Sequence, residues 1–264
     1  MAKLIAVANQ KGGVGKTTTS VNLAACLARA GQRVLLVDMD AQGNASMGVG
    51  VDKASLEHTG CDVLLGERQT SEVMLPVCDG AFYLLASNAD MTAAEVGLRK
   101  QRNGELALTQ AMREVQSRFD YIIADCPPAL SMLTVTALAA CQGVLIPMQC
   151  EYYALEGLSA LLDTVEKVRG VINPELQVEG LLRTMYDPRN RLSGDVSAQL
   201  IEHFGNKVYD TIIPRNVRLA EAPSHGLPAI EYDASASGAL AYQALAAEVI
   251  ERNRTMRSSV RGKA

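Results

Sequence analysis

The chain has 264 residues, with 25 lysines and arginines against 29 aspartates and glutamates, so its formal net charge is −4. This mildly acidic balance excludes a generally basic nucleic-acid-binding protein and confines any DNA contact to a local patch. Hydrophobic residues make up 48% of the chain, which is enough for the core of one large α/β domain. The six cysteines are scattered without a CxxC pair, which argues against a zinc or disulfide framework and favours reduced thiols in a cytoplasmic protein.

Short apolar runs alternate with helical periods along the chain, a pattern typical of a parallel sheet with crossover helices. The expected strands, in chain order, cover 4–8, 33–38, 82–86, 121–125, 143–148, 178–184 and 208–213. The expected helices cover 17–30, 104–117, 131–141, 155–171, 194–204 and 238–253. We therefore predict an α/β fold with a mostly parallel, twisted sheet of about seven or eight strands and helices on both faces.

The C-terminal tail differs in composition from the rest of the chain. No linker or repeat interrupts residues 1–250, and we expect residues 1–253 to form a single P-loop ATPase domain. Residues 254–264 contain no acid and carry Arg254, Arg257, Arg261 and Lys263. We expect this basic tail to be disordered and solvated, and a weak contact with DNA or lipid is the alternative.

A glycine-rich segment, KGGVGKT at 11–17, follows the first expected strand and opens the first expected helix. This is the context of a P-loop, in which glycines let backbone N–H groups surround a phosphate at a helix N-terminus. Lys16 is expected to reach the β- and γ-phosphates, and the Thr17 hydroxyl to bind Mg²⁺. We predict a P-loop ATPase domain that binds ATP and Mg²⁺ through Lys11, Gly12, Gly13, Val14, Gly15, Lys16, Thr17 and Thr18.

The loop departs from the ordinary pattern at two positions. Gln10 stands where GxxxxGK[ST] has its first glycine, and Lys11 adds a second lysine. Two ammonium groups of one chain would crowd one phosphate site, so we predict that Lys11 points outward to the nucleotide of a second subunit. There it would stabilise charge on the γ-phosphate, as an arginine finger does. A solvent-facing lysine is the alternative.

Three aspartates end strands that are expected to lie beside the loop. Asp125 follows the apolar run YIIA, as a Walker B aspartate does, and is expected to hold Mg²⁺ directly or through water. Asp38 and Asp40 end the run RVLLV, and strand ends converge on the ligand crevice. We expect Asp38 to hold Mg²⁺ through its waters or to fix the loop, and Asp40 to orient the attacking water. An ordinary turn aspartate is the alternative for either residue. The predicted catalytic residues are Lys11, Lys16 and Asp40.

Together these residues resemble the deviant Walker A ATPases, and specifically the ParA/Soj family of chromosome- and plasmid-partitioning proteins. The resemblance covers roughly residues 3–250. The first matching stretch indicates only the superfamily, whereas the last two separate ParA-like proteins from their relatives. The matching stretches lie at 8–24, 33–46, 120–138, 146–162 and 213–226.

The resemblance implies a sandwich homodimer in the ATP state, with Lys11 of each chain touching the nucleotide of the other. It places Asp40 at the hydrolytic water and Pro214 and Asn216 beside the adenine. It further implies that the dimer binds double-stranded DNA nonspecifically and is cycled by a ParB/Spo0J-type centromere-binding partner. Such a protein is cytoplasmic, bacterial and associated with the nucleoid.

Arginines that match family positions predict the DNA contacts. The resemblance implies that Arg189 and Arg218 contact the DNA backbone, and Arg183, Arg191 and Arg215 lie in or beside the same loops. Phosphate contacts by arginine are independent of sequence and weaken with salt. Ordinary exposed arginines are the alternative. Ala41 and Arg191 depart from the family pattern, and Arg191 leaves the exact set of DNA contacts open.

Other members of the superfamily supply the competing interpretations. A MinD-like membrane-associated ATPase shares the loop but needs a bulky amphipathic end, whereas this chain ends in AEVIERNRTMRSSVRGKA. No stretch reaches 18 apolar residues, so we expect no membrane-spanning segment, and we expect no membrane among the partners of the folded domain. An iron–sulfur reductase would need cysteine ligands across the dimer. A scaffold gated by ATP with negligible turnover remains open on the sequence alone.

Overall fold

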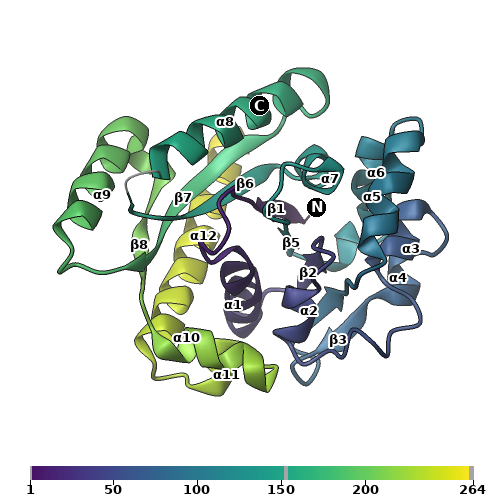
Figure 1. Cartoon of the computed structure of the whole chain (residues 1–264), viewed down its shortest axis with the longest axis horizontal. Coiled ribbons are helices and arrows are strands. Elements are labelled where there is room, and N and C mark those ends of the chain that lie inside the picture. Colours follow the sequence, from purple (N-terminus) through teal and green to yellow (C-terminus); the bar gives the residue numbers. More distant parts are fainter. Residues whose placement is uncertain (1, 152–153, 262–264) are drawn as a thin grey trace.

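The computed structural model describes residues 2–151 and 154–261. Its strands form one sheet in the order β3-β4-β2-β5-β1-β6-β7-β8 (Figure 1). Every neighbouring pair is parallel except β3 and β4. The predicted mostly parallel α/β fold is therefore confirmed. The strands are β1 (Lys3–Val7), β2 (Val34–Asp38), β3 (Leu75–Val77), β4 (Phe82–Leu85), β5 (Tyr121–Asp125), β6 (Gly143–Gln149), β7 (Gln177–Tyr186) and β8 (Val208–Pro214).

Helices cover both faces of the sheet, and each face has its own hydrophobic core. One core lies under α1 (Lys16–Arg29), α2 (Asn44–Met47), α10 (Val217–Glu221), α11 (Ala229–Tyr232) and α12 (Ser237–Arg261). The other lies under α3 (Gly60–Leu65), α4 (Thr70–Val73), α5 (Met91–Lys100), α6 (Ala107–Arg113), α7 (Met132–Ala140), α8 (Ala154–Val171) and α9 (Arg191–Phe204). Short 3₁₀ turns cover Gly104–Leu106, Gln116–Arg118, Gly205–Lys207 and Ala222–His225.

The alternation of side chains along each central strand explains the two cores. In β1, Leu4 and Ala6 face the core under α7, whereas Ile5 and Val7 face the core under α1. All four are buried, because successive strand residues point to opposite faces and both faces are covered. Burying a leucine or isoleucine side chain contributes about 1.5–3 kcal/mol. Continuous apolar runs therefore belong in the middle of this sheet.

The structure differs from the expected elements at several places. The three-residue β3, which contains Pro76 and pairs antiparallel at the sheet edge, was not predicted, nor were the short α3 and α4 or the ten-residue α5. Helix α9 begins at 191 rather than 194, because the Asn190 side chain caps it by accepting from the Leu192 N–H. Helix α12 crosses the expected boundary at 253 and ends at Arg261, so residues 254–261 are helical. Residues 262–264 of the expected tail lie outside the described residues.

The central strand order positions the site. Strand β5 lies between β1 and β2, with Asp125 in register with Val7 on one side and Asp38 on the other. The segment after β1 and the ends of β5 and β2 therefore meet at one edge of the sheet. No helix in the described part of the chain is long and apolar enough to cross a membrane.

Candidate nucleotide-binding site

The loop between β1 and α1 has the backbone geometry of a phosphate cradle. Gly13 and Gly15 adopt left-handed backbone conformations, with φ of 72° and 85°, which residues that have a Cβ atom rarely adopt. Gly15 is the N-cap of α1, whose first turn contains Lys16 and Thr17. The first N–H groups of a helix have no partner within it, and the positive end of the helix dipole lies at the same terminus, here beside the loop. The arrangement suits an anion of the size of a phosphate.

Two side chains outside the predicted loop hold it in place. The Asn9 carboxamide accepts from the Lys11 N–H at 2.9 Å and donates to the Pro147 carbonyl at 2.7 Å. The Thr184 hydroxyl, on β7, donates to the Val14 carbonyl at 2.8 Å. Sequence reasoning missed both residues. Asn9 precedes the predicted loop by two positions and lies within the matching stretch at 8–24. Thr184 lies 170 residues away from its partner, and no local signal identifies it.

Lys16 points back into the loop. Its ammonium group donates to the Lys11 carbonyl at 3.1 Å. Burial lowers the pKa of Lys16, and the nearby Asp125 carboxylate opposes that change. A phosphate oxygen beside this ammonium would compensate for the water that it has lost, so Lys16 is placed to bind an anion.

Asp125 lies directly beneath the first turn of α1. Its carboxylate accepts from the Thr17 hydroxyl at 2.8 Å and from the Ser20 hydroxyl at 2.7 Å. Burial raises the pKa of Asp125, and the negative charge of Asp38 raises it further. A divalent cation would relieve this cost, since it favours the charged carboxylate. The Thr17 hydroxyl and Asp125 could therefore hold Mg²⁺ between them. Ser20 was missed, although its position one turn after Lys16 on the same helix face could have identified it.

Asp38 is oriented toward α2 rather than toward the loop. One carboxylate oxygen accepts from both the N–H and the hydroxyl of Ser46, each at 2.8 Å, and the other accepts from the Asp40 N–H. Burial raises the pKa of Asp38 as well, and these hydrogen bonds partly oppose it. These contacts position the 40–46 segment, a role that the sequence did not predict, and none of them joins Asp38 to the phosphate loop. A role in holding Mg²⁺ through water stays a prediction.

Asp40 follows the end of β2 and is partly exposed at the edge of the site. Its carboxylate accepts from the Gln42 N–H at 2.9 Å, and its carbonyl accepts from the Ser87 hydroxyl at 2.7 Å. The backbone of this segment is therefore fixed, while Asp40 also lies close enough to influence Lys16 and Asp125 electrostatically. This placement is compatible with a carboxylate that orients a water molecule.

An apolar cavity of about 430 Å³ opens beside the loop. It brings Gly15 and Thr18 of the loop together with Pro214 and Asn216, the residues expected at the adenine. The Asn216 side chain is held by two hydrogen bonds: it accepts from the Leu219 N–H and donates to the Ser237 hydroxyl. The size of the cavity and its apolar walls suit a flat aromatic base. Other lining residues include Thr184, Met185, Ile213, Val217, Leu219 and Tyr242.

Comparison with known proteins connects this geometry to a family. An AAA domain model matches residues 2–178. The chain is 49% identical to the sporulation initiation inhibitor protein Soj of Bacillus subtilis, over 94% of this chain and 98% of that protein. It is 44% identical to the chromosome partitioning protein ParA of Caulobacter vibrioides, over 96% of this chain and 95% of the relative. The chain belongs to the ParA/Soj family.

A solved structure repeats the fold of this ParA/Soj protein. Cobyrinic acid a,c-diamide synthase of Mycobacterium smegmatis, crystallised with ADP and magnesium, is 35% identical and superposes with a TM-score of 0.85. The match covers 96% of each chain. The eight-stranded sheet and its loop thus follow an architecture observed with a nucleotide in that protein.

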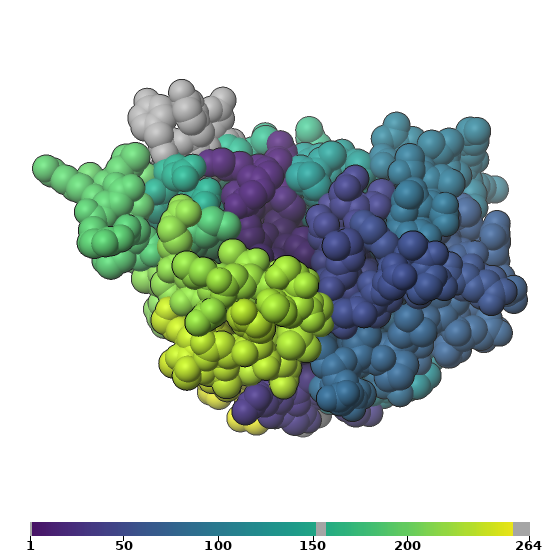
Figure 2. Space-filling model, turned by 60° about the horizontal axis from the view of Figure 1, so that its bottom comes forward, coloured from purple at the N-terminus to yellow at the C-terminus, as the bar shows by residue number. Residues whose placement is uncertain are grey.

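The arginines of the ParA/Soj chain that were predicted to contact DNA differ in their exposure and in their partners. Arg189, Arg191 and Arg215 are exposed around the carboxyl ends of β7 and β8, where Tyr186 pairs with Pro214. The Arg189 guanidinium donates twice to Asp187, at 2.9 and 2.8 Å, and lowers the pKa of that carboxyl to about 2. Figure 2 shows the green segment that carries α9 and the yellow-green segment of α10 and α11 on one face of the molecule.

Arg218 and Arg183 have different surroundings. Arg218 is exposed on α10 and forms ion pairs with Glu221 and Asp233. Arg183 is only 6% exposed, and its guanidinium donates to the Ser197 hydroxyl and to the carbonyls of Tyr209 and Asp210. It ties β7 to α9 and β8 from inside the protein. The structure therefore argues against the expectation that Arg183 contacts DNA.

Proposed function

We propose that the chain is an ATPase that dimerises on binding ATP, binds DNA without sequence preference as a dimer, and releases it after hydrolysis. A ParB/Spo0J-type centromere-binding protein would stimulate the hydrolysis, and the cycle would segregate chromosomes or plasmids in the bacterial cytoplasm, on the nucleoid. The observation that carries this proposal is the convergence of the P-loop, the buried Asp125 and the apolar cavity at one sheet edge. The identity to Soj and ParA supports it.

ATP and Mg²⁺ are the ligands that the site supports. The N–H groups of the loop and the Lys16 ammonium would bind the phosphates, and Thr17 and Asp125 would hold the metal ion. Bound Mg²⁺ would supply charge neutralisation on the phosphate oxygens. The adenine would enter the cavity lined by Pro214 and Asn216.

Hydrolysis requires residues that approach the γ-phosphate from outside the loop. Asp40, fixed at the rim of the site by its backbone contacts, would orient the attacking water. Lys11 is partly exposed, and its ammonium group points to Glu151 rather than into its own loop. A second copy of the chain, facing the first, could receive this ammonium at its nucleotide. Catalysis would then depend on dimerisation.

The exposed arginines support the DNA step. Arg189, Arg191 and Arg215 gather on one edge, Arg218 lies on α10, and a dimer would double the set. Sequence-independent affinity of this kind arises from phosphate contacts and counterion release. The ion pairs of Arg189 and Arg218 are exposed to solvent, which weakens them, so DNA phosphates can compete with Asp187 and Glu221 for these guanidinium groups.

The test is binding of the purified protein to a random-sequence DNA duplex with ATP, ADP or no nucleotide, at low and high salt. We expect binding that requires ATP and weakens as salt rises. Binding that is equal in all three nucleotide states would contradict the ATP-gated dimer. If DNA does not bind in any state, the same measurement with anionic lipid vesicles tests the MinD-like alternative.

A further inference from the structure

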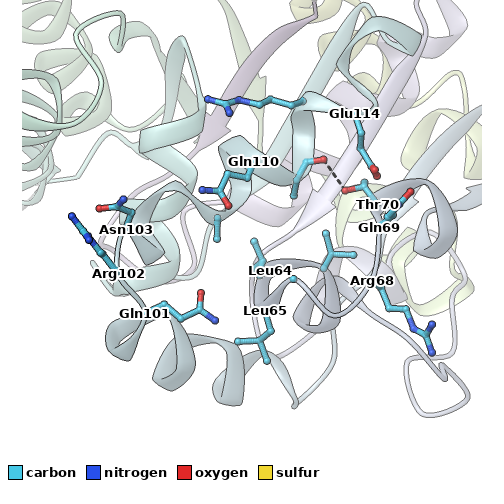
Figure 3. Close-up of a pocket in the computed structure, with 15 residues that line it drawn as sticks. Leu64, Leu65, Arg68, Gln69, Thr70, Gln101, Arg102, Asn103, Gln110 and Glu114 are labelled. Atoms are coloured by element: carbon cyan, nitrogen blue, oxygen red, sulfur yellow. Dashed lines mark hydrogen bonds between the residues drawn. The ribbon is translucent and has the colours of Figure 1, made fainter.

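A second cavity, of about 520 Å³, lies on the side of the molecule away from the nucleotide site. Its walls come from the end of α3, the turn before α4, the turn after α5, and α6 (Figure 3). In Figure 1 these helices cluster at the edge opposite α9. None of the residues proposed to bind ATP, Mg²⁺ or DNA lines this cavity. It therefore needs an explanation of its own.

The floor of the cavity is apolar and closely packed. Val63 and Leu64 are buried, and Leu65 is partly buried beside them. A Cβ atom at Gly97 on α5 would lie only 2.7 Å from the Leu65 side chain, so α3 and α5 are in close contact here. Because these side chains are closely packed, they cannot easily move to fill the cavity. The cavity is therefore preformed and can accommodate one apolar side chain of a ligand.

The rim of the cavity is polar and carries an excess of positive charge. Arg68, Arg102 and Arg113 are exposed, and none of them has an ion pair within the described part of the chain. Against these three arginines the lining contains one acid, Glu114, which accepts a hydrogen bond from the Ser71 N–H. The local balance is thus three positive charges to one negative, in a chain whose formal net charge is −4.

Besides Gln69, the N-cap residue of α4, three carboxamides complete the rim. Gln101, Asn103 and Gln110 are exposed, and Figure 3 shows Gln101 and Gln110 directed toward the opening between α5 and α6. No hydrogen bond of these three side chains occurs among the residues that the structure describes. Each carboxamide has N–H groups that can donate to a peptide carbonyl and an oxygen that can accept from a peptide N–H.

We propose that this cavity binds an acidic peptide segment of a partner protein, with one apolar side chain on the leucine floor and carboxylates on the arginines. Guanidinium groups bind carboxylates through two parallel hydrogen bonds, which gives selectivity for aspartate and glutamate. The carboxamides bind the backbone on either side of the apolar residue. A DNA duplex is a wide, convex ligand that cannot reach the floor of a cavity of this size, so the apolar seat favours a peptide.

The experiment selects short random peptides from a display library against the full-length protein, with ATP present. We expect the enriched peptides to share acidic residues around one leucine, isoleucine, methionine or phenylalanine. A labelled, synthesised peptide of this kind should bind more weakly as salt rises. Failure to enrich any peptide, or enrichment of basic ones, would refute the proposal.

Variants locate the binding site of the enriched peptide. Arg102→Glu combined with Arg113→Glu should weaken its binding at least tenfold, the scale expected when charge-assisted hydrogen bonds at a concave site are removed. Lys100→Glu is the matched control, because Lys100 is exposed beside Gln101 but does not line the cavity. Unchanged ATP binding in both variants would show that they are folded. Equal losses of peptide affinity in the two variants, or none in the double variant, would overturn the assignment.

Discussion

The ammonium group of Lys11 lies 2.6 Å from the carboxylate of Glu151 in the same chain. Lys11 belongs to the loop after β1, and Glu151 follows the end of β6. The lysine that we propose to act on a partner subunit is therefore held by an intramolecular ion pair. Reaching a second nucleotide would require this pair to open, which makes Glu151 a competitor of the dimer contact.

Glu151→Gln should promote dimerisation. Opening the exposed pair between Lys11 and Glu151 costs about 0.2–1 kcal/mol, and the substitution removes that cost. We therefore expect the dimer to form at an ATP concentration roughly 1.4- to fivefold lower. Sedimentation velocity across an ATP titration measures this. Glu166→Gln, which removes the partner of Arg169 on α8, is the control. Weaker dimerisation of Glu151→Gln would instead assign Glu151 to the dimer contact itself.

The two lysines of the loop should separate nucleotide binding from dimerisation. Lys16→Ala removes the buried ammonium group and should abolish ATP binding in a fluorescent-nucleotide titration. Lys11→Ala should bind ATP within about threefold of the parent chain and remain a monomer, because its ammonium group points away from its own loop. ATP-dependent dimers of Lys11→Ala would contradict the action in trans.

Asp40→Ala should slow hydrolysis without preventing ATP binding. Loss of a carboxylate that orients the attacking water is expected to reduce turnover by about 10²–10⁴-fold, and the ATP-bound dimer should persist on DNA. Phosphate release measures the rate, and retention of labelled DNA measures persistence. Asp52→Ala, which removes the carboxylate of an exposed residue in a different loop, is the control. Normal turnover in Asp40→Ala would assign the water to another residue.

Charge reversal on the arginine edge should remove DNA binding selectively. Arg189→Glu combined with Arg215→Glu should reduce affinity at least tenfold while ATP-dependent dimers still form. Because fewer phosphates are contacted, the slope of log affinity against log salt should become less steep. Arg169→Glu on α8 is the control, because it reverses the charge of an arginine that lies away from this edge. If the double variant binds DNA as tightly as the parent, the interface lies elsewhere.

Glu248 should stabilise the fold in a pH-dependent way. Its carboxylate, on α12, accepts from the N–H groups of Asp210 and Thr211 and from Arg252. Burial opposes ionisation, but these hydrogen bonds and the arginine outweigh it and lower the pKa of Glu248 below its ordinary 4.5. Its contribution is therefore present above pH 4.5 and is lost as pH falls through the lower, folded-state value.

Glu248→Gln should lower the free energy of unfolding by about 1–2 kcal/mol at neutral pH. Urea denaturation at decreasing pH should show the difference between the two proteins shrinking below pH 4.5. A difference that stays constant down to strongly acidic pH would show that the charge of Glu248 contributes nothing.

Local patterns predicted the sheet and the loop. The central strands are continuous apolar runs because both of their faces are covered, and the KGGVGKT segment is recognisable because its chemistry depends on adjacent backbone groups. Even the proximity of Asp38 and Asp125 followed from strand ends in a parallel sheet. Edge strand β3 escaped prediction because three residues around a proline carry no periodicity.

Contacts between distant segments required the tertiary structure. Arg183 and Arg189 are close in sequence and carry the same guanidinium group, yet Arg183 lies between β7, β8 and α9, whereas Arg189 is exposed to solvent. Nothing local distinguishes them, because burial depends on which elements pack above a residue. Lys11 and Glu151 are 140 positions apart, so their ion pair likewise depends on how the elements pack and not on local sequence. The sequence alone determined the fold class and the phosphate loop, since both rest on backbone periodicity and short spacing. Only the packing of remote elements decided which charged side chains are exposed and which partners they have.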